Sequence, residues 1–112
     1  MAHDVYISYS SPNGNVADAV CAKLEERKIR CWIAPRDVPP GLSYATSIVN
    51  AIDESRIIVL VFSTSSNNSR QVMHEAERAG SRGIPILTFR VENVMRTPAM
   101  EKFPRILKYV VR

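Results

Sequence analysis

The sequence predicts an α/β fold built on an open, doubly wound parallel sheet of four to five strands, with helices on both faces. Short runs rich in β-branched and aromatic residues alternate along the chain with segments in which apolar residues recur every three or four positions. The connections between them are short, which favours parallel strands joined by crossover helices. The run from Ile57 to Phe62 is apolar throughout, as expected for a central strand buried on both sides.

Each element of this fold can be assigned to a stretch of sequence. The expected strands are residues 5–9, 30–33, 57–62 and 84–89, followed, after a short helix near residue 97, by an edge strand at 106–111. The expected helices carry the apolar stripes Val16/Val20/Leu24, Tyr44/Ile48/Ile52 and Val72/Ala76/Ala79. Polar loops follow the first three strands, at 10–14, 34–41 and 63–68. Ligands of doubly wound sheets bind beyond the carboxyl ends of the strands, so these loops are the predicted site.

Composition narrows the class of protein. A chain of 112 residues fits one domain, which excludes two-domain cofactor enzymes. The net charge is +4, but the arginines are interleaved with acids and no aromatic-basic motif accompanies them, so nucleic acid is not favoured as a partner. Neither a membrane-spanning run nor a signal-peptide pattern is present, and we expect a cytoplasmic protein with no membrane partner. Cys21 and Cys31 lack metal-ligand spacing and are expected to be buried thiols.

Common catalytic and nucleotide-binding motifs are missing. The sequence contains neither GxGxxG nor GxxxxGK[ST]. A response regulator needs acidic residues after its first and third strands, where this chain has serine and threonine. A Ser-His-Asp triad is not supported, because His3 and His74 are the only histidines and no GxSxG elbow is present. We therefore expect no metal and no cofactor.

Three segments, in order, resemble the TIR (Toll/interleukin-1 receptor) domain family, prokaryotic type. Residues 4–10, DVYISYS, are similar to its box 1, and residues 36–41, RDVPPG, to its BB loop. Residues 69–75, SRQVMHE, are similar to the Ser-x(5)-Glu run that opens the helix after the third strand. The resemblance implies the flavodoxin-like TIR fold in a single domain, residues 1–112. The closing helix typical of the family is not expected within the sequence.

The resemblance also implies an enzyme. TIR domains of this kind often cleave the nicotinamide-ribose bond of NAD⁺, as glycohydrolases or cyclases, and their essential glutamate corresponds to Glu75. NAD⁺ is then a substrate, and one ionised carboxylate suffices because nicotinamide leaves without needing a proton. A place in the first two turns of a helix favours the anion by ~0.3–1 kcal/mol. From spacing alone, the alternative is a solvated glutamate paired with Arg78 or Arg82.

Further substrate contacts are expected around Glu75. Tyr9 and Ser10 end the first strand and are expected to contact the nicotinamide half of NAD⁺. Arg36 and Asp37 are also expected to bind substrate, with Arg36 meeting the pyrophosphate. The alternatives are Tyr9 as core filling and Arg36 as a salt bridge to Asp37. Trp32 is expected to belong to the core rather than to form a cofactor platform.

Two more substrate-binding residues are expected at the start of the glutamate's helix. Ser69 begins the family's motif run, and Gln71 lies one helical turn before Glu75. Many catalytic family members carry a tryptophan at the position of Gln71. This departure removes the expected stacking wall of the pocket.

The proline-rich loop after the second strand favours a role in assembly. Three prolines make it stiff and protruding. The resemblance implies that it docks onto other TIR domains in a homo-oligomer or filament, completing the site for immune-type or anti-phage signalling. A non-catalytic interaction module that acts through the same loop is the alternative function. The predicted interaction residues are Pro35, Arg36, Asp37, Val38, Pro39, Pro40 and Gly41.

Overall fold

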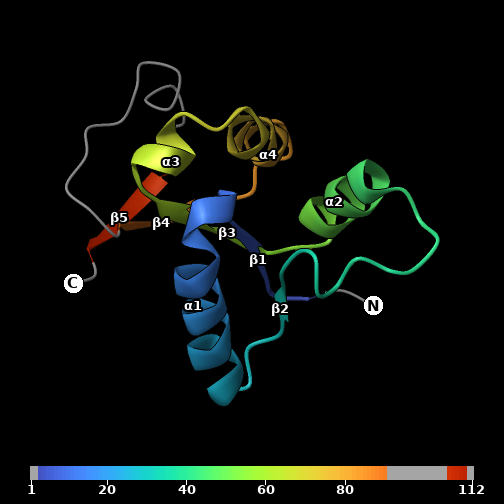
Figure 1. The fold of residues 1–112 in the computed structure, drawn as a ribbon, viewed down its shortest axis with the longest axis horizontal. Coiled ribbons are helices and arrows are strands. Elements are labelled where there is room, and N and C mark those ends of the chain that lie inside the picture. The colour runs from blue at the N-terminus through green and yellow to red at the C-terminus, as the bar shows by residue number, and fades with distance from the viewer. Residues whose placement is uncertain (1–2, 91–105, 111–112) are drawn as a thin grey trace.

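A single parallel sheet organises the chain. The structure, a computed structural model, describes residues 3–90 and the backbone of residues 106–110. Its five strands lie in the order β2-β1-β3-β4-β5, all parallel (Figure 1). This confirms the predicted fold class, while the helix expected near residue 97 lies outside the described residues. The strands are β1 (Val5–Ser8), β2 (Cys31–Trp32), β3 (Ile57–Phe62), β4 (Ile86–Arg90) and β5 (Ile106–Val110).

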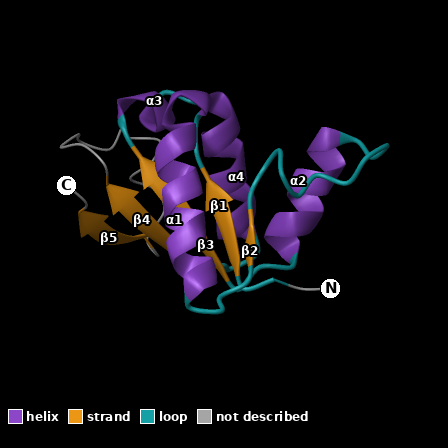
Figure 2. Cartoon of the chain, turned by 60° about the horizontal axis from the view of Figure 1, so that its bottom comes forward, coloured by secondary structure: helices purple, strands orange, loops and turns teal. Residues whose placement is uncertain are grey.

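Helices cover both faces of the sheet (Figure 2). Helix α1 (Gly14–Glu26) packs on one face, and α2 (Tyr44–Asp53) and α4 (Arg70–Ser81) pack together on the other. Successive side chains of a strand point to opposite faces. On β1, Val5 and Ile7 therefore pack with α1, whereas Tyr6 packs with α2 and α4. Ser8, two positions after Tyr6, faces the same side as Tyr6.

β2 ends earlier and β4 begins later than the sequence predicts, because other groups take the backbone hydrogen bonds at these ends. β2 ends before Ile33, whose N–H donates to the Asp37 carboxylate at 2.9 Å. β4 begins after Pro85, which has no N–H to donate. The preceding Ile84 donates its N–H to Ala79 at the end of α4, at 2.9 Å. In both cases a side chain or a helix end replaces the neighbouring strand as the partner.

The first and third predicted loops contain short helices. Residues Ser11–Asn13 form a 3₁₀ turn, η1, that leads directly into α1, and residues Thr64–Asn67 form the helix α3. Helix α3 begins with a capping box, in which Ser63 and Ser66 satisfy each other's backbone N–H groups. The prediction of plain loops was wrong here, because serine runs favour capping as well as turns. Ser63 also donates to Asn13 and so joins the first and third segments.

Candidate active site

Glu75 lies in the second turn of α4 and faces the interior. The helix begins at the N-cap Ser69, whose side chain accepts from the N–H of Val72 at 3.2 Å. Glu75 is only 5% exposed and shares the buried face of α4 with Val72 and Ala76. The alternative of a solvated glutamate is therefore wrong.

The arginines that were candidate partners of Glu75 bind another carboxylate. Arg78 and Arg82 both pair with Asp53 at the end of α2, and the Arg78 pair has two hydrogen bonds. Of the residues described between positions 3 and 90, no lysine or arginine pairs with the Glu75 carboxylate.

Neutral donors hold the Glu75 carboxylate. Ser8 Oγ donates to Oε1 at 2.7 Å, and Gln71 Nε2 donates to Oε2 at 3.2 Å. The Tyr6 hydroxyl is a third hydrogen-bond partner. Burial raises the pKa of Tyr6, and the nearby Glu75 raises it further, so Tyr6 keeps its proton and acts as a donor. The carboxylate is fixed in direction from β1 and from its own helix.

Burial controls the acidity of Glu75. Loss of solvation raises the pKa of Glu75 above that of an ordinary glutamate, although the hydrogen bonds from Ser8, Gln71 and Tyr6 act in the opposite direction. Sequence reasoning considered only the helix position, which favours the anion. Burial outweighs that contribution, because an anion in a low-dielectric interior loses more solvation than a helix end restores.

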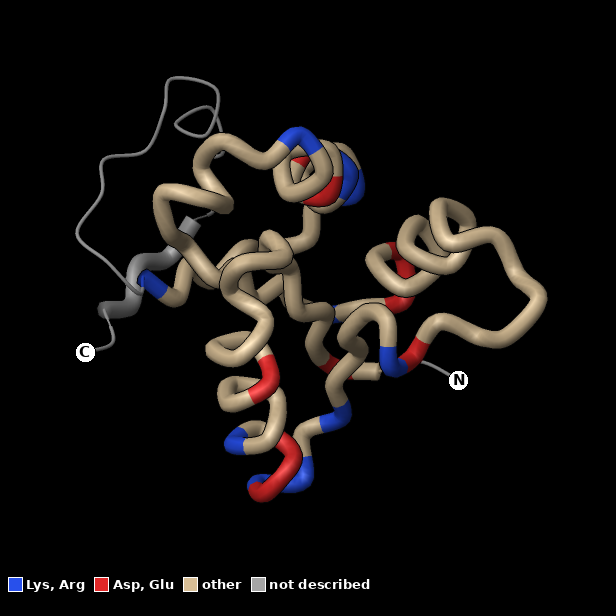
Figure 3. Tube along the Cα trace, in the orientation of Figure 1, with Lys and Arg blue, Asp and Glu red and all other residues tan. Residues whose placement is uncertain are grey.

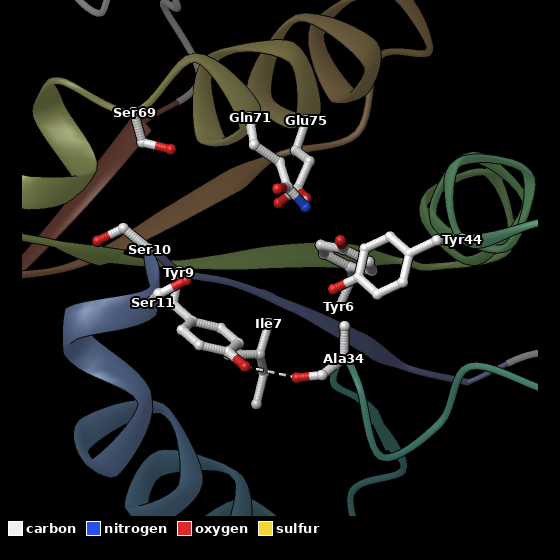
Figure 4. A pocket seen from close by; sticks show the side chains of 10 residues that line it. All are labelled: Tyr6, Ile7, Tyr9, Ser10, Ser11, Ala34, Tyr44, Ser69, Gln71 and Glu75. Carbon is white, nitrogen blue, oxygen red and sulfur yellow. Dashed lines mark hydrogen bonds between the residues drawn. The ribbon is translucent and has the colours of Figure 1, made fainter.

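Among the residues that the structure describes, Glu75 is the only charged one that lines a small cavity, which we call the Glu75 pocket (Figure 4). Its volume is about 100 Å³. Charged positions lie along α1, in the segment that follows it, on α4 and at the end of α2, whereas η1 and α3 carry none (Figure 3). The residues that line the pocket are Tyr6, Ile7, Tyr9, Ser10, Ser11, Ala34, Tyr44, Ser69, Gln71 and Glu75.

The structure brings four of the predicted substrate-binding residues to Glu75. Tyr9, Ser10, Ser69 and Gln71 all line the Glu75 pocket. Tyr9 also packs against the α1 side of the core and donates its hydroxyl to the carbonyl of Ala34 at 2.5 Å, so core filling and pocket lining are both realised. These placements agree with the predicted positions, while contact with substrate stays a prediction.

Arg36 and Asp37 do not line the Glu75 pocket. The Arg36 guanidinium donates to Glu25 at 2.9 Å and to Asp37 at 2.8 Å. This is the alternative arrangement considered for Arg36, with a further partner on α1. Asp37 in turn holds the backbone of Ile33. The expected contact of Arg36 with a pyrophosphate is not prepared in this arrangement, because two carboxylates already neutralise the guanidinium.

The loop after β2 combines tight turns with an exposed tip. Backbone hydrogen bonds from Asp37 to Ile33 and from Val38 to Pro35 close its first half. Gly41 has φ +81°, a conformation that L side chains rarely adopt. Directly after it, Leu42 is 59% exposed. The loop therefore presents an apolar side chain on a constrained backbone.

Sequence reasoning missed three residues of the site. The sequence pattern places Tyr6 and Ser8 in a strand within box 1, and Tyr44 in a helix stripe, but assigns none of them to the site. Period-two alternation could have placed Tyr6 and Ser8 on one face of β1, and a serine inside a buried strand signals a polar partner. Trp32 was correctly predicted as core, and it stacks on Tyr6 with ring centroids 5.4 Å apart.

A second cavity adjoins the Glu75 pocket. It lies between α2 and α4, has a volume of about 350 Å³, and we call it the α2–α4 groove. Both cavities are lined by Tyr44, Gln71 and Glu75. The groove is within the size range of small-molecule sites, which the Glu75 pocket alone is not. Its further lining residues are Ala45, Ile48, Val49, Ile52, His74 and Arg78.

The two cysteines are buried, as predicted. Burial raises the pKa of Cys21 and raises that of Cys31 to about 12, so both remain thiols. Within the described residues, no group of three or more His, Cys, Asp or Glu side chains is arranged to hold a metal ion. In the same part of the chain, no helix has the length and apolar character needed to cross a membrane.

Comparisons with known proteins identify the family and the fold. Residues 5–110 match the TIR domain family. No curated protein matches the sequence. The solved TIR domain of the Toll-related receptor TRR-2 from Hydra magnipapillata has a TM-score of 0.80 at 22% identity, covering 96% of this chain and 85% of that one. The prokaryotic subtype stays a prediction.

Two further solved structures share the fold. The TIR domains of the activated Roq1 resistosome give a TM-score of 0.71 at 20% identity, covering 81% of this chain and 58% of that one. The CMP N-glycosidase BcmB from Clostridium botulinum gives 0.66 at 12% identity, covering 95% and 88%. At these identities the similarity shows a common fold.

Proposed function

This chain belongs to the TIR domain family, and we propose that it cleaves the nicotinamide-ribose bond of NAD⁺, as a glycohydrolase or cyclase with Glu75 as the catalytic residue. One observation carries the proposal. Glu75 is a buried carboxylate held by neutral donors, and no other charged side chain in the described part of the chain lines its pocket. Burying a carboxylate without a cation costs free energy. A cationic substrate supplies the missing countercharge.

The chemistry fits a site with one carboxylate. When the C1′–N bond breaks, the electron pair goes to the ring, nicotinamide leaves neutral, and positive charge moves onto the ribose. No general acid is needed for this leaving group, unlike in ordinary glycosidases with their two carboxylates. Glu75 stabilises the developing cation and accepts hydrogen bonds from the ribose hydroxyls. Water then completes hydrolysis, or a nitrogen of the same molecule completes cyclisation.

Ser8, Gln71 and Tyr6 act on the orientation of Glu75. Their hydrogen bonds approach the carboxylate from β1 and from one turn earlier on α4. A carboxylate fixed before the substrate binds need not reorganise as charge develops. The fold is also compatible with this class of reaction, since a protein of the same fold is described as a CMP N-glycosidase.

Assembly between TIR domains is the second part of the proposal. The exposed apolar side chains that follow the loop are Leu42 (59%), Tyr44 (49%) and Val49 (39%). Apolar groups gathered on one exposed segment favour contact with another protein. A related fold occurs in the Roq1 resistosome. We place the protein in cytoplasmic, immune-type or anti-phage signalling, with the non-catalytic interaction module as the second candidate.

NAD⁺ consumption by surface-clustered protein tests the catalytic proposal. Liquid chromatography with mass detection measures nicotinamide and its partner product for the wild type, Glu75→Gln and the matched control Glu77→Gln, an exposed glutamate on the same helix. We expect Glu75→Gln to lower nicotinamide release by at least about 100-fold, and Glu77→Gln to retain it. Unchanged release from Glu75→Gln would refute Glu75 as the catalytic residue, and no release from the clustered wild type would leave the interaction module as the function.

A further inference from the structure

Tyr44 lies where the two cavities meet. It is the first residue of α2, directly after the N-cap Ser43. Its side chain lines both the Glu75 pocket and the α2–α4 groove, and its ring lies opposite the side chains of Gln71 and Glu75 (Figure 4). Its hydroxyl is close enough to Tyr6 and Tyr9 to affect their acidity. Tyr44 thus belongs to the same polar cluster as Glu75.

Tyr44 is 49% exposed, which distinguishes it from the other aromatic residues of the Glu75 pocket. Tyr6 is 1% exposed and already stacks on Trp32. The hydroxyl of Tyr9 is tied to the Ala34 carbonyl, and its ring packs against the α1 side of the core. Among the residues lining the pocket, Tyr44 is therefore the aromatic side chain with the most surface left for a ligand.

We propose that Tyr44 is the aromatic platform of the site and that it stacks on the planar, cationic base of the substrate. The inference rests on the proposed function. It names Tyr44 as the residue that recognises the base that leaves in the reaction. A cationic ring over the face of a phenol is attracted by the negative π surface. Gln71 supplies no aromatic surface, so the platform comes from α2, across the pocket, instead of from the glutamate's own helix.

The charge of the base has a kinetic consequence. The base is cationic in the bound substrate and becomes neutral as the C1′–N bond breaks. Attraction between the cation and the Tyr44 ring is thus stronger before the transition state than in it. Such an interaction lowers KM, and because it stabilises the bound substrate more than the transition state it also lowers kcat. Loss of a residue that only maintained the fold of α2 would not change KM and kcat in this way.

Binding to a protein that cannot turn over separates this inference from the proposed function. We would immobilise Glu75→Gln protein at high density and measure the affinities of NAD⁺ and NADH by surface plasmon resonance. NADH carries a neutral nicotinamide ring. We expect Tyr44→Ala in this background to weaken NAD⁺ binding by about 2- to 30-fold and NADH binding much less. Tyr44→Phe keeps the ring and should stay within about twofold.

Thr46→Ala is the matched control, since Thr46 is an exposed residue of α2 that lines neither the Glu75 pocket nor the α2–α4 groove. With Glu75 intact, Tyr44→Ala should raise KM for NAD⁺ and should raise kcat, not lower it. The inference is overturned if Tyr44→Ala binds NAD⁺ as Glu75→Gln alone does, if it weakens NAD⁺ and NADH equally, or if NAD⁺ does not bind at all. Absence of cleavage by the wild type refutes the proposed function, whereas these affinities decide the role of Tyr44.

Discussion

Asp53 and Glu75 are carboxylates on two helices that pack together, and their surroundings differ in charge and in burial. Asp53, at the end of α2, pairs with Arg78 and Arg82 near the surface, and the hydrogen bonds from Arg78 lower its pKa. Glu75, on α4, is buried among neutral donors, and loss of solvation raises its pKa. The first carboxylate is already neutralised by the protein. The second is left for a ligand to neutralise, and this difference separates a structural residue from a candidate catalytic one.

The largest expected effect is that of acid on activity. Cleavage requires ionised Glu75, so the rate should fall about tenfold per pH unit below the pKa of Glu75. Because burial raises this pKa, the decline should begin at a higher pH than an ordinary glutamate would give. A pH profile of kcat/KM on clustered protein measures it. A rate that stays constant down to the pH at which exposed glutamates titrate contradicts the assignment.

An intermediate effect is a gain in stability when the charge of Glu75 is removed. The folded-state pKa lies above the unfolded one, so between the two values the folded state holds more protons and stability falls as pH rises. Above both values the full cost of the buried anion is present. Glu75→Gln should therefore raise Tm at neutral pH, and the gain should vanish in acid, where wild-type Glu75 is protonated.

Thermal unfolding of wild type and Glu75→Gln across a pH series provides this test. A loss of activity combined with a gain in stability is the signature of a site maintained for function. A Tm that is lower for Glu75→Gln at neutral pH means that the carboxylate stabilises the fold and that the comparison with Asp53 fails.

The smallest expected effect is that of Asp53→Asn. The ion pairs of Asp53 lie near the surface, with side-chain exposures of 37% for Arg78 and 53% for Arg82, and pairs of this kind contribute little to stability. We expect Tm to fall slightly at low salt and less at high salt, with NAD⁺ cleavage retained. Salt-dependent thermal unfolding checks this. If Asp53→Asn abolished cleavage, both carboxylates would belong to the site.

The fold was predictable because burial follows the spacing of apolar residues. The run Ile57–Phe62 forms β3 with the predicted bounds. The ends of strands were harder to predict from the sequence. β2 ends before Ile33, because the N–H of Ile33 donates to the carboxylate of Asp37, four residues later in the chain. The helix Thr64–Asn67 escaped prediction because serine is common in both turns and caps.

The candidate site was predictable only where a motif marked it. Glu75 was located by its register and by the family resemblance, but its acidity depends on burial by β1 and α2, which no local pattern gives. Arg36 was expected beside the substrate but lies outside the Glu75 pocket. Its partner Glu25 is on α1, eleven residues earlier in the sequence, and no local pattern predicts this pairing. Tyr44 joins the site through the packing of α2 beside α4, which is a tertiary relation.

The most direct test of the central claim is an NMR titration of the Glu75 carboxyl carbon, whose signal is assigned by its loss in Glu75→Gln. The titration is carried out with and without the N-methylnicotinamide cation, a probe that cannot be cleaved. In the free protein, we predict that Glu75 titrates above the range of an ordinary glutamate. When the cation binds, the pKa should fall, because the carboxylate then has its countercharge. An ordinary pKa that the cation leaves unchanged would contradict the account of Glu75 as a buried anion awaiting a cationic substrate.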